Sequence, residues 1–137
     1  MSHLHPFCWP IRVYYEDTDT GGIVYHANYL KYFERARTEL LRSIGVNQHV
    51  LFEEHTAFVV RHMDIDFFKG ATLDESLTVQ TTVSELRRVT LTFCQDLVNS
   101  KGDVLCRALV KVACVDSEKM KPKSIPISIQ SEIFSER

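Results

Sequence analysis

The sequence predicts an α+β protein in which a five-stranded antiparallel sheet packs against one long helix. Apolar residues recur at helical spacing from Tyr29 to Ile44, and Gly45 follows where a glycine commonly ends a helix. Several later segments instead alternate apolar and polar residues over lengths typical of strands. Because turns of hairpin length join these segments, the sheet is expected to be antiparallel.

The first half of the chain is expected to hold a strand, the long helix and a short connection. Met1–Pro10 forms a lead-in, and the first strand covers Ile11–Tyr15. The long helix carries charged residues opposite its apolar stripe, among them Glu34 and Arg37, which are spaced to pair at i,i+3. The stretch 46–56 reads as a short helix or turn.

The second half is expected to form a four-stranded meander. The predicted strands cover 57–68, 77–84, 89–97 and 104–115. In the first, Val59, Met63, Ile65 and Phe67 are assigned to one face, which Arg61 interrupts. The last is apolar on both parities and is assigned to the sheet interior. A short helix from Ile127 to Ser135 ends the chain. One sheet and one helix leave a sheet edge uncovered, so a homo-oligomer is expected.

Length and composition indicate a single domain over residues 1–137. Hydrophobic residues make up 45% of the chain and the net charge is -2, which argues against bulk binding of nucleic acid or anionic lipid. The four cysteines show neither C-x-x-C nor zinc spacing, so no metal site and a reducing, cytosolic setting are expected. No segment approaches the roughly 18 apolar residues of a membrane span.

The loop between the first strand and the long helix is where chemistry is expected. It holds the carboxylates of Glu16, Asp17 and Asp19, the pair Gly21–Gly22, and His26. A helix start adds unpaired amide groups and a partial positive charge. Taken alone, Asp19 is more simply an N-cap residue, Asp17 a loop or cap residue, and His26 a hydrogen-bonded histidine on the buried face of the helix.

Several motifs together resemble one known family. They are Arg12–Asp19, Gly22–Tyr29, Phe33–Arg37, Ala57–Arg61, Val112–Asp116 and Lys119–Pro122. The sequence closely resembles the hotdog-fold acyl-CoA thioesterases, and within them the 4-hydroxybenzoyl-CoA thioesterase-like branch and its group associated with the Tol–Pal system. The most specific part is the pattern D-x-D-x-x-G-x-V-x-H-x-x-Y, and the resemblance covers nearly the whole chain.

The resemblance implies a fold, an activity and a site. The sheet should wrap the central helix, sheets should join edge to edge in dimers that can pair into tetramers, and active sites should lie at subunit boundaries. The activity implied is hydrolysis of acyl-CoA to free acid and coenzyme A without a cofactor. Asp19 matches the catalytic aspartate, as general base or nucleophile. His26 matches the assisting histidine, and Tyr15 is a further candidate catalytic residue.

The remaining site predictions concern substrate binding. Glycines allow close approach, amides near the helix start can polarise the thioester carbonyl, and basic residues can contact the phosphates of coenzyme A. The residues assigned on these grounds are Gly22, Val24, Tyr25, Arg87, Arg88 and Lys121. Each of these basic residues is, taken alone, more simply a solvated surface charge.

Two other function classes compete with the thioesterase. The first is a binding or scaffold protein for acyl carrier protein or phospholipid-synthesis enzymes, peripheral to the inner membrane and linked to envelope maintenance. The second is a hotdog dehydratase or hydratase, which needs an acid–base pair for the β-carbon, and no such motif is present. The preferred acyl chain and the choice between dimer and tetramer are left open.

Overall fold

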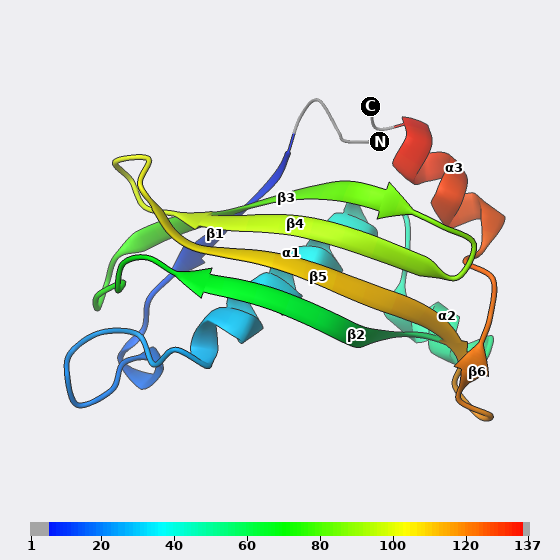
Figure 1. The fold of residues 1–137 in the computed structure, drawn as a ribbon, viewed down its shortest axis with the longest axis horizontal. Coiled ribbons are helices and arrows are strands. Elements are labelled where there is room, and N and C mark those ends of the chain that lie inside the picture. Colours follow the sequence, from blue (N-terminus) through cyan, green and yellow to red (C-terminus); the bar gives the residue numbers. More distant parts are fainter. Residues whose placement is uncertain (1–5, 136–137) are drawn as a thin grey trace.

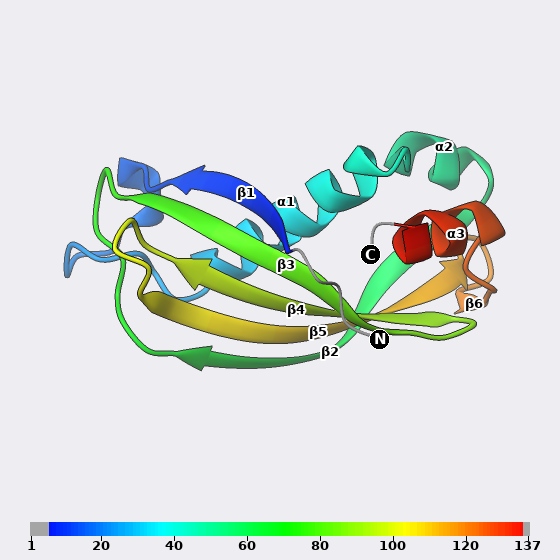
Figure 2. The same cartoon turned by 90° about the horizontal axis from the view of Figure 1, so that it is seen from above.

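A curved antiparallel sheet wraps around a long helix in this protein (Figures 1 and 2), whose computed structural model describes residues 6–135. The strands are β1 (Phe7–Arg12), β2 (Thr56–Phe67), β3 (Ser76–Leu86), β4 (Thr90–Val98), β5 (Val104–Asp116) and the short β6 (Lys121–Pro122). The helices are the 3-10 helix η1 (Tyr15–Asp17), α1 (Asn28–Ser43), α2 (Gln48–Glu53) and α3 (Ile127–Ser135). The predicted α+β hotdog architecture is therefore confirmed.

Helix α1 forms the centre of the fold because one of its faces is almost wholly apolar. Its buried residues are Tyr29, Tyr32, Phe33, Ala36, Arg37, Leu40 and Leu41. The helix ends at Ser43 with Ile44 as its C-cap, and Gly45 follows in the predicted C′ position with a φ of 88°, the left-handed conformation that favours glycine. There the amide of Val46 donates to the carbonyl of Leu41 at 2.9 Å. The exception on the buried face is the charged Arg37, which was expected to pair with Glu34.

The strand order is β1-β3-β4-β5-β2, so the predicted four-stranded meander is wrong in one respect. Only β3, β4 and β5 form a meander, while β2 pairs with β5 and is a sheet edge. The loop 68–75 returns the chain from this edge to β3. It passes the start of α1, where the amide of Val24 donates to the carbonyl of Ala71 at 2.8 Å. Sequence alternation alone carries no information about this crossover.

A β-bulge in β2 explains why Arg61 interrupts the apolar pattern. The register against β5 shifts between Val60 and His62, so Arg61 is an extra residue. Before the bulge, Phe58 and Val60 lie on the face toward the helix, opposite the buried Cys114 and Val112 of β5. Beyond the bulge, the same face carries the later apolar residues of β2. The assignment of Val59 to that face is wrong, because the bulge reverses the parity.

The chain termini differ modestly from expectation. Strand β1 begins at Phe7 rather than Ile11, and Phe7 and Trp9 pack against the core. It ends before Tyr14, because Tyr14 precedes η1 and its amide donates to the Asp17 carboxylate. Helix α3 has the predicted bounds. Residues 1–5 of the lead-in and 136–137 of the tail lie outside the described residues. Among residues 6–135, no helix is both long and apolar enough to span a membrane.

Candidate active site

Asp19 lies at the tip of a short hairpin between η1 and α1. Its backbone amide donates to the carbonyl of Ile23 at 2.8 Å, and its Oδ1 accepts from the amide of Gly21, also at 2.8 Å. A Cβ on Gly21 would lie 3.2 Å from that Oδ1, and Gly22 has a φ of 83°, so both glycines are suited to this turn. The Asp19 side chain is exposed, and the N-cap of α1 is Ala27, so the N-cap alternative is wrong.

Asp17 holds the base of the same hairpin. Its Oδ2 accepts from the amide of Tyr14 at 2.9 Å, and its Oδ1 accepts from the Asn28 amide group at 3.3 Å. The carbonyl of Asp17 also accepts from the backbone amide of Tyr25 at 2.9 Å. The two nearby aspartates therefore differ in surroundings. Asp17 accepts hydrogen bonds from Tyr14, Tyr25 and Asn28, whereas Asp19 is exposed at the tip of the hairpin.

His26 lies in the turn that precedes α1 and is exposed. The prediction that it faces the buried side of the helix is wrong, because the helix begins at Asn28 and helical spacing does not extend back to His26. Its ring meets that of Phe67 edge-on, with centroids 6.0 Å apart, and lies 4.7 Å from the ring of Tyr25. His26 thus joins the start of α1 to the end of edge strand β2.

Tyr29 forms the buried floor beneath this turn. Its hydroxyl accepts from the amide of Ala71 at 3.1 Å, and its ring centroid lies 5.7 Å from that of Phe67. Burial raises the pKa of Tyr29, and the charge of Asp19 adds in the same direction, which places Asp19 within electrostatic reach. No local pattern marks Phe67 or Ala71 as neighbours of the site, since the end of β2 brings Phe67 there and the crossover loop brings Ala71.

The amides at the helix start are only partly available. Those of Val24 and Tyr25 already donate to the carbonyls of Ala71 and Asp17. Those of His26 and Ala27 form no hydrogen bond to any residue that the structure describes. The prediction that amides around Val24–His26 can donate to the thioester carbonyl is therefore wrong for Val24 and Tyr25. The available donors are the amides of His26 and Ala27, next to the helix N-terminus.

The predicted phosphate-binding residues belong to the β3–β4 turn and to β6, which lie at the opposite end of the sheet from the loop between η1 and α1 that carries Asp19 (Figure 1). Arg87 pairs with Glu85 at 3.0 Å, which raises the pKa of Arg87 and lowers that of Glu85. Arg88 donates to the hydroxyl of Ser124 at 2.8 Å. Lys121 is exposed in β6. Within one chain these residues are near one another but are not brought to Asp19.

Tyr15 is also not drawn into the cluster around Asp19. It lies in η1 and is 82% exposed, and its carbonyl accepts from the amide and hydroxyl of Thr18. Its structural contribution is therefore through the backbone. Among residues 6–135 the Tyr15 hydroxyl has no hydrogen-bond partner, and its catalytic role stays a prediction.

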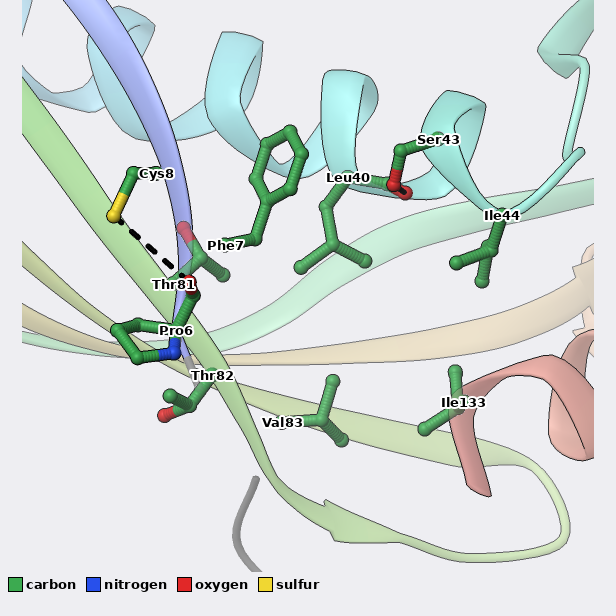
Figure 3. A pocket seen from close by; sticks show the side chains of 10 residues that line it. All are labelled: Pro6, Phe7, Cys8, Leu40, Ser43, Ile44, Thr81, Thr82, Val83 and Ile133. Carbon is green, nitrogen blue, oxygen red and sulfur yellow. Dashed lines mark hydrogen bonds between the residues drawn. The ribbon is translucent and has the colours of Figure 1, made fainter. Parts of the chain in front are cut away.

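An apolar cavity of about 320 Å³ lies toward the end of α1 farthest from its N-terminus (Figure 3). It is lined by Pro6, Phe7, Cys8, Leu40, Ser43, Ile44, Thr81, Thr82, Val83 and Ile133. These residues come from the start of β1, the last turns of α1, β3 and α3. None of the predicted site residues lines it, so this cavity is separate from the Asp19 hairpin.

Comparisons with known proteins agree with the motif. The model of the thioesterase-like superfamily matches residues 13–133. The acyl-CoA thioester hydrolase YbgC of Escherichia coli O6:H1 is 49% identical over 126 residues, covering 92% of this chain and 94% of that protein. The acyl-CoA thioesterase YbgC of Haemophilus influenzae is 51% identical, covering 91% and 92%.

A solved structure extends the comparison to the fold. A probable thioesterase from Bartonella henselae is 38% identical to this chain and superposes with a TM-score of 0.79, covering 89% of this chain and 99% of that one. The resemblance seen in the D-x-D pattern is thus matched over almost the full length of both proteins. The chain belongs to the thioesterase-like superfamily.

Proposed function

We propose that this protein hydrolyses acyl-CoA thioesters to a free acid and coenzyme A, with Asp19 as the reacting carboxylate. The observation that supports this proposal most directly is the Asp19 hairpin. It presents an exposed carboxylate, fixed by the Gly21 amide, next to a helix start with unused amides at His26 and Ala27. The names and high identity of the two YbgC relatives support acyl-CoA as the substrate.

The chemistry follows from these groups. The amides of His26 and Ala27 donate to the thioester oxygen as negative charge develops there, and such a donor typically lowers the barrier by about 3–4 kcal/mol. Asp19 activates a water molecule as general base, or attacks the carbonyl and forms a transient anhydride. The exposed His26 ring assists at the same carbonyl. No metal or organic cofactor is needed, because a thioester is already activated for acyl transfer.

A second copy of the chain would complete the site. Strand β2 is a sheet edge, and edge strands readily pair with another chain. Antiparallel pairing of β2 with the same strand of a second copy reverses the partner's direction. The end of the partner that carries its Arg87, Arg88 and Lys121 then lies beside Asp19. Such a dimer would account for phosphate-binding residues that are remote from Asp19 within one chain.

Asp19→Asn tests the assignment. We expect kcat/KM for acyl-CoA to fall by about 100- to 10,000-fold, because the amide can neither accept a proton nor attack the thioester. Asp74→Asn is the matched control, since it makes the same change on an exposed residue of the neighbouring loop. Wild-type turnover by Asp19→Asn would contradict the assignment. A wild-type protein that hydrolyses no acyl-CoA would contradict the function.

The narrower expectations stay predictions. A cytosolic location is supported by four free cysteines, which suit a reducing compartment. The link to the Tol–Pal system, peripheral association with the inner membrane and binding of acyl carrier protein follow from the resemblance alone. Co-purification of acyl carrier protein with a catalytically inactive wild-type protein would favour the binding role over the hydrolase.

A further inference from the structure

A guanidinium group is buried between α1 and the sheet. Arg37 is only 8% exposed, although arginine is rarely buried without an anionic partner. Its Nη1 donates to Oε1 of Gln95 at 2.9 Å. Gln95 is itself fixed, because its Nε2 donates to the carbonyl of Phe33 at 2.9 Å and to the hydroxyl of Thr81 at 3.1 Å. The acceptor offered to Arg37 is therefore held in place, but it is neutral.

No carboxylate neutralises this buried charge within the described chain. No ion pair within 4.0 Å joins Arg37 to any described acidic residue. Glu34, one turn away, is exposed, and its charge opposes the lowering of the Arg37 pKa that burial causes. A buried, uncompensated cation is unfavourable, and the other N–H groups of the guanidinium require acceptors.

Arg37 lines a cavity of about 180 Å³ on the inner face of the sheet. The cavity lies beside the edge strand and is lined by Glu34, Arg37, Thr38, Leu41, Phe58, Val60, Leu91, Phe93 and Val112. Six of its nine lining residues are apolar, Arg37 supplies a cationic group, and the carboxylate of Glu34 lies on the same wall. Taking ~30 Å³ for each water-sized group, there is room for about six non-hydrogen atoms.

We infer that this cavity receives the acyl group of the substrate and that Arg37 selects short acyl groups that end in a carboxylate. The inference rests on the proposed function and names its substrate class. In the β2-paired dimer, Phe58 and Val60 of one copy lie opposite the end of the partner's β2, where the partner's Phe67 contacts its His26. The cavity is then next to the partner's Asp19 hairpin, and a terminal carboxylate accepts two N–H groups of Arg37.

Two substrates of the same shape test the selection. Glutaryl-CoA and 5-methylhexanoyl-CoA differ only in ending with a carboxylate or with an isopropyl group. We expect wild-type kcat/KM to be at least about tenfold higher for glutaryl-CoA. In Arg37→Met, kcat/KM for glutaryl-CoA should fall by about 10- to 100-fold, as expected for a lost charge-assisted hydrogen bond. Its value for 5-methylhexanoyl-CoA should be unchanged or higher.

Arg35→Met is the matched control, because Arg35 is exposed on the same helix and should show the wild-type preference. Equal loss on both substrates in Arg37→Met would mean that Arg37 is only structural, and would overturn the inference. If Arg37→Met does not fold, the wild-type comparison decides: a preference for 5-methylhexanoyl-CoA overturns it. These outcomes are distinct from failure of the proposed function, in which neither substrate is hydrolysed.

Discussion

At the scale of single residues, Asp17 and Asp19 show how position in a loop separates two identical side chains. Asp19 keeps its carboxylate exposed, whereas both oxygens of Asp17 accept hydrogen bonds, from Tyr14 and from Asn28. The same residue type can therefore supply chemistry at one position and hold the chain at the other. Asp17 positions Asp19 through Thr18, the single residue between them.

Exchanging Asp17 and Asn28 tests this positioning role. Asparagine at 17 has one acceptor oxygen for two donors, so Asp17→Asn should lower kcat by about 10- to 100-fold, because small misplacements of a reacting group are costly. The double variant Asp17→Asn/Asn28→Asp restores a side-chain donor and acceptor to the pair, although the new carboxylate cannot donate to the carbonyl of residue 17, so it should recover part of kcat. KM should change little in either variant.

Steady-state kinetics on one acyl-CoA, with circular dichroism to confirm folding, measures this effect. Wild-type kcat in Asp17→Asn would show that the two hydrogen bonds do not matter for the reaction. An Asp17→Asn variant that folds and loses activity, but is not rescued by the exchange, would assign the loss to the charge of Asp17 instead.

At the scale of elements, Lys123 connects the segment after β6 with the junction between α2 and β2. Its Nζ donates to the carbonyl of Glu54 at 3.1 Å and to the hydroxyl of Thr56 at 2.6 Å, where α2 ends and β2 begins. In sequence, Lys123 lies two positions after Lys121, which was a candidate for phosphate contact. In the structure its hydrogen bonds hold the segment after β6 against the start of edge strand β2.

Lys123→Met should therefore lower stability more than substrate binding. Loss of a charge-assisted hydrogen bond of about 1.5–3 kcal/mol is an upper bound here, because part of the side chain is in water. We expect Tm to fall by roughly 2–6 °C and KM for acyl-CoA to stay within about twofold. Lys119→Met, which alters an exposed lysine nearby, serves as the comparison in calorimetry. A raised KM with unchanged Tm would instead assign Lys123 to substrate binding.

Helices and strands were predicted correctly from the sequence where the periodicity of apolar residues alone determines their bounds and faces. The stripe from Tyr29 onward and the glycine at 45 give α1 to within about one residue at either end. His26 was misplaced because periodicity was extended past the true helix start. Val59 was misplaced because a single extra residue at Arg61 reverses strand parity, and nothing in the local pattern marks a bulge.

The site was predictable only where it is local in sequence. Asp19, Gly21 and Gly22 form one turn, and the motif alone identifies it. Phe67 and Ala71 reach the same place through the crossover from β2 to β3, which depends on strand order rather than on any local signal. The role of Arg37 was hidden because its spacing from Glu34 suits a surface ion pair equally well.

At the scale of the whole molecule, the open edge of β2 leads to a prediction about assembly. Val60 is 52% exposed on this strand, so Val60→Asp should cost the single chain little while placing a charge at the proposed junction. Sedimentation equilibrium should give about twice the 15.8 kDa chain mass, or a higher multiple, for the wild type and a large monomer fraction for the variant. Because Val60 also lines the Arg37 cavity, the mass of the variant, rather than its activity, reports on the junction.

The control for this experiment is Ile127→Asp, since Ile127 is 79% exposed at the start of α3, away from β2. It should leave both mass and activity unchanged. A wild-type protein that sediments as a monomer and still hydrolyses acyl-CoA would contradict the dimeric site.

The contact between Ala71 and Tyr29 spans 42 positions along the chain. It forms only when the loop that follows β2 passes the start of α1 on its way to β3, so the floor beneath Asp19 needs both of these distant segments. Loop closure over such a separation is slow and entropically costly compared with helix formation. The Asp19 hairpin is local in sequence, but its support depends on this long-range contact. A newly made chain should therefore acquire its helix and hairpins before it acquires catalytic competence.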